Sequence, residues 1–403
     1  MKSDDTVQPV QHPVRPLAEA QSPDAWLLKP GVTFLNHGSF GAVPRVVFEE
    51  QTEWRQRVEA EPIELLARRR EELVAGAKRA VGDYLGMRPE DFGFVANATD
   101  GVNAVLRSMD LRPGDELLTT DHVYHAIRQA MRYVAGRAGA TVRELPVPLP
   151  VESAGQIADT VLAALTPRTR LLMIDHVTSP TALVFPVERI IAGCAGRGVD
   201  VLVDGAHAPG MLPLDIGRLG AAYYAGNLHK WVCAPKGSAF LWVRPDLQAN
   251  VHPLVISHFL GEGFTPEFGW QGTRDYSALW ATPRAIEWLA GFGWDAVRAH
   301  NHELAVRAHR MLCERWGVPP LSPIDGRLLG SMAAMPLPPP LDRMTEQEGT
   351  TLQQRLYSEL GLEVPLSYWN GKRWLIRVSC QLYNRWGDYE RVGEVVDGLR
   401  ERR

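Results

Sequence analysis

Short apolar runs recur along the first two thirds of the chain, and polar, glycine-containing segments separate them. The clearest of these runs cover residues 92–96, 116–119, 170–175, 199–204, 221–225 and 238–243. Between them, charged residues alternate with Val, Leu and Ala in a way that is typical of helices, over residues 48–84, 101–109 and 187–197. Near-continuous apolar strands separated by helices predict a mostly parallel sheet that is covered on both faces.

The pattern changes after about residue 282. Helical stretches then alternate with strand-like runs, and a proline-rich link interrupts them, at residues 303–316, 329–335, 336–340, 350–360 and 374–378. We therefore predict an α/β protein with three parts: an N-terminal arm (1–30), a large sheet domain (31–281) and a smaller C-terminal α+β domain (282–403). The polar, proline-containing residues 1–24 are expected to be flexible.

The bulk composition argues against several classes of function. The chain has 403 residues and a net charge of −4, so no overall field attracts nucleic acid or an anionic membrane. No apolar stretch approaches the ~18 residues that span a bilayer, and the N-terminus has no apolar signal core. The four cysteines form no C-x-x-C pair, which argues against a disulfide framework or a metal site. We expect a cytoplasmic protein without a bound metal.

An aspartate and a lysine stand at the ends of two predicted strands. Asp204 ends the run 199–204, and Lys230 follows the run 221–225 after a turn of small and polar residues. Ligands of such sheets bind at the carboxyl ends of the strands. An acid and a lysine there suit pyridoxal phosphate, because the amine condenses with the cofactor's aldehyde and the carboxylate keeps the pyridine nitrogen protonated. Taken singly, either residue is more often an ordinary solvated group. Other polar residues at or just past such ends are Asn97, Thr99, Asp175 and His229.

A candidate phosphate site lies between the run 92–96 and the helix that follows it. The free N–H groups of a helix start, together with the hydroxyl of Thr99, form a site for an anion. An ordinary helix N-cap by Thr99 or Asp100 explains the same residues. Asn227 and His229, next to the lysine, add side-chain donors.

Together these motifs resemble the class V branch of the fold-type I pyridoxal phosphate enzymes, and within it the isopenicillin N epimerase-like group. The resemblance covers about residues 34–377. It rests on FLNHGSFG (34–41), NAT (97–99), DHVTS (175–179), DGAHAPG (204–210), HKW (229–231), GTRD (272–275) and IRVS (376–379). It implies a large domain with a seven-stranded type of sheet, and a homodimer whose active sites form across the subunit interface.

The resemblance assigns roles at the cofactor. Lys230 is the Schiff-base lysine and then the proton shuttle at the substrate Cα, which requires a lowered amine pKa. Asp204 pairs with the pyridine nitrogen. His207 lies near the phenolic oxygen of the ring, with Ser179 as a weaker candidate. The resemblance implies that the phosphate is held by Thr99, Ala98, Asn227, His229 and the partner subunit's Thr273.

It also assigns roles at the substrate, a small molecule of the amino-acid class. Arg377 clamps the substrate carboxylate, for which a guanidinium has the better geometry; a surface ion pair is the alternative. His122 or Tyr124 lies over the cofactor face opposite the lysine, and the choice between them stays open. Asn36 and His37 line the substrate entrance, although a turn explains them equally well.

The region before Arg377 departs from the cysteine desulfurases of the same class, which carry a mobile cysteine there. Residues 364–371 contain no cysteine, and Cys380 is expected in the core. Persulfide chemistry on a protein cysteine is therefore not expected.

Pyridoxal phosphate labilises bonds at Cα, and the protein selects the outcome. We expect first an epimerase of a small-molecule or antibiotic pathway, with Lys230 on one face of Cα and Tyr124 or His122 on the other. A carbon–sulfur β-lyase, like hercynylcysteine sulfoxide lyase, needs only Lys230 and a polarised leaving group. Transamination and decarboxylation are further alternatives. A non-catalytic protein on this fold is disfavoured by the joint presence of Lys230, Asp204 and Arg377.

Overall fold

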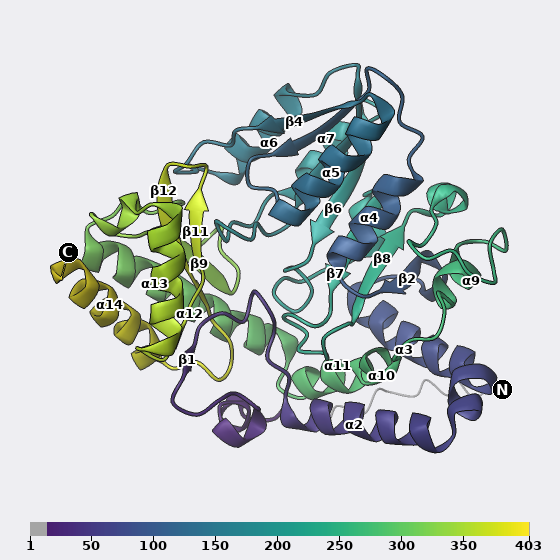
Figure 1. Ribbon diagram of the computed structural model, residues 1–403, viewed down its shortest axis with the longest axis horizontal. Helices are drawn as coiled ribbons and strands as arrows, with labels where there is room; N and C mark the ends of the chain where they lie inside the picture. The colour runs from purple at the N-terminus through teal and green to yellow at the C-terminus, as the bar shows by residue number, and fades with distance from the viewer. Residues whose placement is uncertain (1–13, 403) are drawn as a thin grey trace, which may run out of the picture.

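A single seven-stranded sheet forms the centre of the molecule in the computed structural model, which describes residues 14–402 (Figure 1). The spatial order is β2-β8-β7-β6-β5-β3-β4. The neighbours from β7 to β4 pair in parallel, whereas β8 runs antiparallel to both β7 and β2. The mostly parallel sheet is thus confirmed. Its strands are β2 (Phe92–Val95), β3 (Glu116–Thr120), β4 (Thr141–Leu145), β5 (Thr169–Asp175), β6 (Asp200–Gly205), β7 (Tyr223–Asn227) and β8 (Ala239–Val243).

Both faces of the sheet are buried, which explains the continuous apolar runs. In β5, Leu172 and Ile174 belong to one core cluster, whereas Leu171 and Met173 belong to a second. Successive side chains of a strand point to opposite faces, so each face needs apolar residues of its own.

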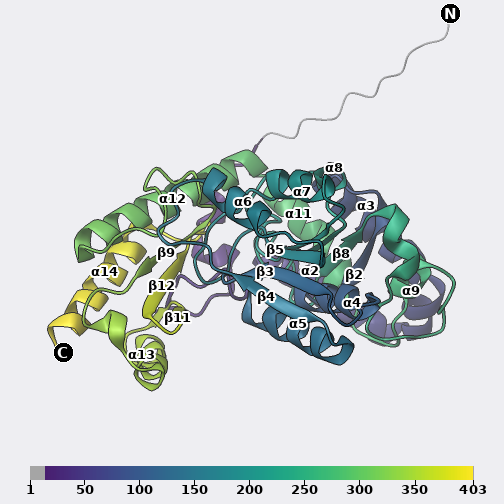
Figure 2. The same ribbon diagram turned by 90° about the horizontal axis from the view of Figure 1, so that it is seen from above.

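Helices cover the two faces of the sheet (Figure 2). One face carries α4 (Ala98–Ser108) and α5 (His125–Ala138), and the other carries α6 (Ala154–Ala163) and α7 (Val187–Ala195). Gly101 allows α4 to lie close to the sheet, because a Cβ there would meet Ala225 at 3.2 Å and Leu241 at 3.3 Å.

Further helices flank this sheet. The predicted helical segment 48–84 is two α-helices joined by a π-helical turn. These elements are α2 (Arg45–Ala60), η2 (Glu64–Arg68) and α3 (Arg70–Leu85). Shorter elements are η3 (Pro89–Asp91), α8 (Ile216–Leu219), η4 (Pro245–Asn250), α9 (Phe264–Gly269), α10 (Ser277–Trp280) and α11 (Thr282–Ala290).

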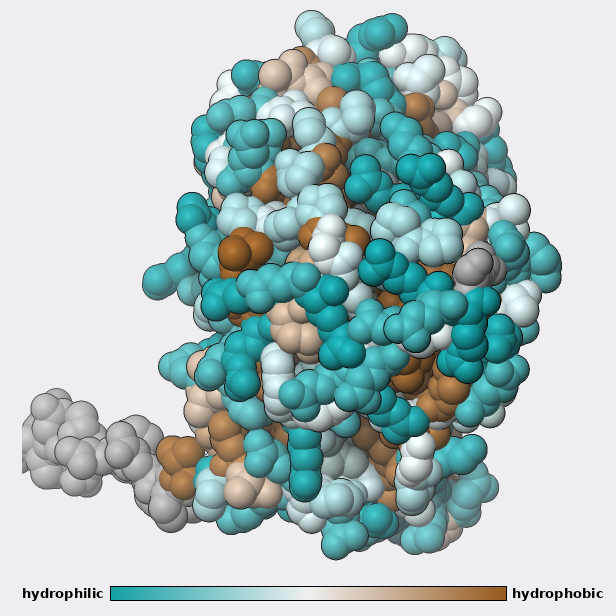
Figure 3. Space-filling model, turned by 90° about the vertical axis from the view of Figure 1, so that its left-hand side faces the viewer, coloured by the Kyte–Doolittle hydropathy of each residue, from teal (hydrophilic) through white to brown (hydrophobic). Residues whose placement is uncertain are grey.

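The C-terminal part has a small antiparallel sheet of order β11-β12-β9. It comprises β9 (Met332–Pro336), β11 (Leu366–Trp369) and β12 (Arg373–Ser379), with helices α12 (Trp294–Trp316), α13 (Glu346–Ser358) and α14 (Trp386–Glu401) and the turn η5 (Leu341–Arg343). A separate parallel pair joins β1 (Thr33–Phe34) to β10 (Leu362–Glu363), so the chain's early and late segments meet. The face of this part in Figure 3 is mostly hydrophilic, with scattered apolar side chains.

The N-terminal segment contains two short helical elements as far as the structure describes it. Residues 14–24 include α1 (Leu17–Ala20) and most of η1 (Pro23–Ala25), and the indole of Trp26 donates to the carbonyl of Ala20 at 2.7 Å. The predicted flexibility of residues 1–24 stays a prediction, and residues 1–13 lie outside the described residues. Among residues 14–402, no helix is both long and apolar enough to cross a bilayer, and no group of His, Cys, Asp or Glu could hold a metal ion.

Candidate active site

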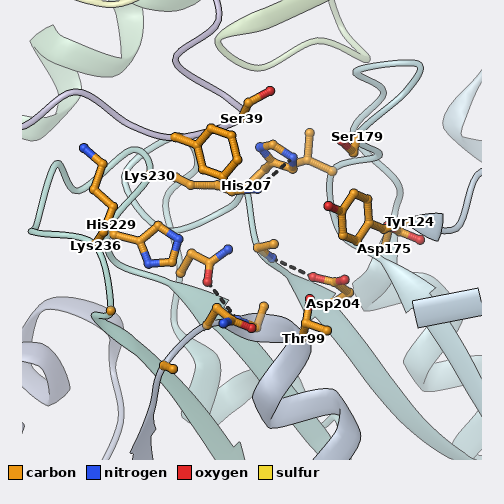
Figure 4. Close-up of a pocket in the computed structure, with 18 residues that line it drawn as sticks. Ser39, Thr99, Tyr124, Asp175, Ser179, Asp204, His207, His229, Lys230 and Lys236 are labelled. Carbon is orange, nitrogen blue, oxygen red and sulfur yellow. Dashed lines mark hydrogen bonds between the residues drawn. The ribbon is translucent and has the colours of Figure 1, made fainter. Parts of the chain in front are cut away.

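A cavity of about 540 Å³ opens at the carboxyl ends of β2, β5, β6 and β7 (Figure 4). Because β8 alone is reversed, these four strands end at the same edge of the sheet. The cavity gathers predicted residues that lie far apart in the sequence. Those that line it are Ala98, Thr99, Tyr124, Ser179, Asp204, His207, Asn227, His229 and Lys230.

Lys230 reaches into this cavity from the turn that follows β7 (Figure 4). Its Nζ lies 3.3 Å from Nε2 of His207. Burial, and secondly the positive charge of Arg377, lower the pKa of Lys230 to about 8. A lowered pKa makes the neutral amine available near neutral pH, as both a nucleophile and a base at Cα require.

Two carboxylates stand side by side at the ends of β5 and β6, where Asp175 and Asp204 pair in register. Asp204 accepts the N–H of Ala206 at 2.9 Å, whereas Oδ2 of Asp175 has no hydrogen-bond partner. Burial raises the pKa of both side chains, and the charge of Asp204 adds to the effect on Asp175. The charges of Lys230 and Arg128 oppose this rise only in part, and a protonated pyridine nitrogen at Asp204 would add a cation.

The first turn of α4 brings backbone N–H groups to the cavity. Asn97 is its N-cap, rather than Thr99 or Asp100, and its side chain accepts the N–H of Asp100 at 2.9 Å. Asn227 reaches across from β7, and its Oδ1 accepts the N–H of Ala98 at 2.8 Å. The helix start is therefore fixed to the strand that precedes Lys230, in a position suited to an anion.

His229 also lines the cavity, at the end proposed for the anion. Its Nδ1 lies 3.0 Å from the carbonyl oxygen of Ser238 and must donate to it, so Nε2 remains for a ligand. Burial, with the charge of Lys230, lowers the pKa of His229 to about 4. An approaching dianionic phosphate would raise that pKa again.

Sequence reasoning gave no role to several lining residues, among them Lys236, Ser39 and Phe40. Lys236 donates to the carbonyl oxygen of Gly41 at 2.5 Å, and its ammonium adds a cation to the phosphate end. At Gly41 a Cβ would lie 2.5 Å from the carbonyl oxygens of His229 and Lys230, so glycine lets this loop pack on the lysine turn. For Ser39 and Phe40 the sequence did contain a signal, because both belong to the motif 34–41 that the family resemblance rests on.

Arg377, on β12, lies behind two lining residues of the cavity, Ser179 and Ser39, and 5 % of its surface is exposed. Its Nη1 donates to the backbone oxygen and the hydroxyl of Ser179, at 2.7 and 3.0 Å, and its Nη2 donates to Ser39 at 3.1 Å and to Asn36 at 3.4 Å. Its Nε has no partner, and all four acceptors are neutral. Burial lowers the pKa of Arg377 to about 10. The residue is not a surface ion pair, and a buried guanidinium without a counter-ion suits an anionic ligand.

Three predicted residues lie away from the cavity. His122 is fully buried, and its Nδ1 lies 2.7 Å from the hydroxyl of Thr181, so Tyr124 alone of the two candidates faces the cavity. His37 is also buried, and its Nε2 contacts the backbone oxygen of Lys230 at 3.0 Å, so it supports the lysine turn from behind. Thr273 is exposed on a loop.

Asn36 does not line the cavity, but it accepts a hydrogen bond from Arg377. Its Nδ2 donates to Glu363 at 2.8 Å, and its Oδ1 accepts from Ser39 at 2.5 Å. The position predicted as a substrate contact therefore orients the arginine and the loop of Ser39.

The cysteines take no part in this site. All four lie in the described part of the chain, all are buried and none lines the cavity. Cys380 is fully buried, as predicted.

The fold and the site together define a pyridoxal phosphate enzyme of fold type I. The chain belongs to the class-V aminotransferase family, whose model matches residues 36–329. It is 36 % identical to the isopenicillin N epimerase of Amycolatopsis lactamdurans, over 92 % of this chain and 96 % of that protein. It is 34 % identical to putative L-cysteine desulfhydrase 1 of Oryza sativa subsp. japonica, over 92 % and 83 %.

A solved structure has the same fold. It is a mutant of C-DES with glycine covalently linked to its PLP cofactor, and it matches with a TM-score of 0.78 at 23 % identity. The match covers 91 % of this chain and 96 % of that one.

The cavity fits pyridoxal phosphate on its own evidence. The neutral amine of Lys230 suits the aldehyde, the buried carboxylate of Asp204 suits the ring nitrogen, and Thr99 at the positive end of α4 suits the phosphate. Asp175 lines the same space, and Arg377 contacts two residues that line it, Ser179 and Ser39.

Proposed function

We propose that this enzyme inverts the Cα centre of an α-amino acid, as an isopenicillin N epimerase-like enzyme of secondary metabolism. The observation that carries the proposal is the buried guanidinium of Arg377, which has no acidic partner. It is hydrogen-bonded to Ser179 and Ser39, which line the cavity together with Lys230. A substrate carboxylate gives Arg377 the charge that it lacks and presents Cα towards Lys230.

Each residue of the site has its own role in the proposed reaction. Bound pyridoxal phosphate supplies an electron-accepting ring that stabilises the charge left at Cα. Lys230 takes the Cα proton, since its pKa of about 8 leaves part of the amine neutral near neutral pH. Asp204 balances the positive charge at the ring nitrogen, Arg377 fixes the carboxylate and His207 orients the amine across their 3.3 Å contact.

Inversion also requires a proton donor on the other face of Cα, and the position of Tyr124 supports this. Its side chain and that of Lys230 enter the cavity from different sides (Figure 4). We infer that Lys230 removes the proton from one face and that the hydroxyl of Tyr124 returns a proton to the other. His122 is excluded from this task by its burial.

A carbon–sulfur β-lyase is the second candidate. The observation in its favour is the 34 % identity to the rice desulfhydrase, which is close to the 36 % identity to the epimerase. Elimination needs a base such as Lys230 and a carboxylate clamp such as Arg377, but no donor on the second face. No residue of the cavity favours transamination or decarboxylation over these two reactions.

Incubation of the holoenzyme with a panel of L-amino acids in D2O separates the two candidates. For an epimerase, we expect intact substrate of both configurations with deuterium at Cα. A 2-oxo acid with ammonia would identify a lyase instead. If no amino acid exchanges its Cα proton or forms a product, both proposals are wrong.

We also propose a homodimer in which Thr273 of each chain completes the other chain's phosphate site. Thr273 is exposed and lies outside its own cavity. The segment before it exposes an apolar group that favours a protein interface, formed by Leu254, Val255, Ile256 and Leu260. Sedimentation of the holoenzyme tests this, and a monomer that retains its cofactor fully would contradict it.

A further inference from the structure

A second carboxyl group lines the active-site cavity beside Asp204. Asp175 is the last residue of β5, and it pairs in register with Asp204 on the neighbouring parallel strand β6. Neighbouring strands are about 4.8 Å apart, and register partners point to the same face of the sheet, so the two carboxyl groups lie side by side (Figure 4). Pairing with the ring nitrogen of the cofactor explains Asp204, but it does not explain Asp175.

The two carboxyl groups are deeply buried and have few partners. Asp175 is 3 % exposed and Asp204 is 4 % exposed. Asp204 accepts the N–H of Ala206, whereas Oδ2 of Asp175 has no hydrogen-bond partner. No salt bridge joins either group to a residue of the described part, 14–402. Two buried carboxylates repel each other strongly when both are ionised, so such a pair retains a proton.

The charges around the pair decide which partner holds that proton. Lys230 favours the ionised form of Asp204. Burial, and secondly the charge of Asp204, raise the pKa of Asp175 well above its usual range. Arg128 opposes this rise, but its guanidinium is already bonded to Glu144 at 2.8 Å. Asp175 is therefore the protonated partner.

The other titratable groups near the pair are neutral. His176 and Tyr224 bond to each other at 2.9 Å. Burial lowers the pKa of His176 to about 4 and raises the pKa of Tyr224 well above its usual range. In the cavity, burial and the charge of Lys230 lower the pKa of His207 well below its usual range. None of these groups supplies a positive charge that would let both carboxyl groups ionise.

We propose that Asp175 and Asp204 hold one proton between them, and that Asp175 carries it as a hydrogen-bond donor to Asp204. A donor to a carboxylate favours its ionised form and makes it a weaker base. Asp175 is then a positioning residue, because it keeps Asp204 ionised and leaves the proton of the ring on the ring nitrogen. The inference goes beyond the proposed function, since an epimerase and a lyase both need a protonated ring.

Infrared difference spectroscopy of the holoenzyme tests the protonation itself. The spectra of protein with and without carbon-13 at the aspartate carboxyl carbons isolate the stretch of any protonated aspartate. We expect this band at pH 7 in the wild type and its absence from Asp175→Asn. Asp110→Asn is the matched control and should keep the band, since Asp110 is 87 % exposed and lies outside the cavity. If the wild type lacks the band, or if Asp175→Asn retains it, the inference is wrong.

The pH dependence of stability gives a second measurement. A carboxyl group with a raised pKa keeps its proton in the folded state after the unfolded chain has lost it, so this group makes the wild type less stable as pH rises above about 4. Asp175→Asn lacks this loss. With saturating cofactor, the Tm of Asp175→Asn should therefore gain on that of the wild type between pH 5 and pH 8. A difference in Tm that stays constant over this range would contradict the inference.

The positioning role is tested at the ring nitrogen, by nitrogen-15 NMR of holoenzyme made with labelled cofactor. Asp175→Leu keeps the branched shape of the side chain but cannot donate a hydrogen bond. Loss of one hydrogen bond to a charged group shifts a proton equilibrium about 10- to 100-fold, so the ring signal should move towards its unprotonated position. Asp175→Asn restores a neutral donor and should keep the wild-type signal.

A merely structural role of Asp175 would change stability or cofactor affinity without moving the ring signal. An identical nitrogen-15 signal in Asp175→Leu and the wild type would therefore overturn the positioning role, and so would an equal shift in the Leu and Asn variants. These measurements need no substrate, so their outcome is independent of which reaction the enzyme catalyses.

Discussion

The imidazole of His207 is held between the indole of Trp231 and the amine of Lys230. The indole N–H, which only donates, points at Nδ1 of the imidazole from 3.4 Å, and Nζ of Lys230 lies 3.3 Å from Nε2. Burial keeps the pKa of His207 well below its usual range, so the ring is neutral and carries its proton on Nε2. That proton faces the lysine nitrogen, and this arrangement favours the neutral amine.

Uptake of pyridoxal phosphate by the apoenzyme should therefore level off near pH 8. Only the neutral amine attacks the aldehyde, so the rate rises about tenfold per pH unit below the pKa and becomes flat above it. With the pKa of Lys230 at about 8, instead of 10.5, the plateau begins near pH 8. Stopped-flow absorbance between pH 6 and 10 measures this rate. A rate that still climbs at pH 10 would contradict the lowered pKa.

The variant Arg377→Met provides the internal control for that profile. The positive charge of Arg377 is the second cause of the low pKa of Lys230, so its removal should move the inflection to higher pH. The titration of the free cofactor is common to both proteins and cancels in the comparison.

The covalent bond to the cofactor should depend on one of the two lysines in the cavity. Borohydride treatment of the yellow holoenzyme should fix the cofactor to Lys230, and Lys230→Ala should abolish this labelling. Lys236→Ala is the matched control, because Lys236 lines the same cavity but contacts Gly41. Peptide mass spectrometry identifies the labelled residue. A colourless protein that takes up no pyridoxal phosphate would contradict the whole assignment.

Arg377→Ala should weaken α-amino acid binding by roughly 30-fold to several thousand-fold. Loss of a buried charge-assisted pair costs about 2–5 kcal/mol, and each ~1.4 kcal/mol is a factor of ten. The absorbance of the resting holoenzyme should hardly change, because the arginine donates to Ser179, Ser39 and Asn36 and has no hydrogen bond to Lys230, Asp204 or His207. Titration of both proteins with one amino acid measures the difference. Unchanged affinity would show that the substrate carboxylate binds elsewhere.

Asn227→Ala should loosen the cofactor more than the substrate. It leaves the N–H of Ala98 without its partner at 2.8 Å, and an unsatisfied buried donor costs about 1–3 kcal/mol. The dissociation constant for pyridoxal phosphate should rise about 5- to 100-fold in equilibrium dialysis. Asn103→Ala is the control on the same helix, since Asn103 contacts Thr99 but does not line the cavity. Equal loosening by both variants would argue against a specific role of Asn227.

Much of the sheet could be predicted from sequence because its strands are buried on both faces. The exception is β4, an edge strand whose alternating polar residues give it no continuous apolar run. Helix ends were predicted less well. α4 begins at Ala98, three residues before the predicted start at 101, and α12 begins at Trp294 rather than at 303. In both helices the extra turns include polar or charged residues that periodicity alone does not assign.

Most residues predicted at the cofactor line one cavity, because they lie at or just past strand ends at one edge of the sheet. The residues around the substrate were not, because their roles depend on which way a side chain turns. Neighbours in the same motif diverge: Tyr124 faces the cavity, whereas His122 is buried against Thr181. His37 likewise turns towards the backbone of Lys230.

The variant Tyr124→Phe should distinguish proton transfer at one face of Cα from proton transfer at the other. The change keeps the ring and removes only the hydroxyl, so substrate binding should change little. Epimerisation should fall about 10²- to 10⁴-fold, the usual contribution of a positioned acid. Deuterium should still enter Cα in D2O with retention of configuration, because Lys230 still serves its own face. Chiral chromatography with mass spectrometry measures inversion and exchange in the same sample. Tyr133→Phe, an exposed position on the same helix, controls for loss of a hydroxyl as such. Inversion at the wild-type rate in Tyr124→Phe would exclude this hydroxyl as the second proton donor.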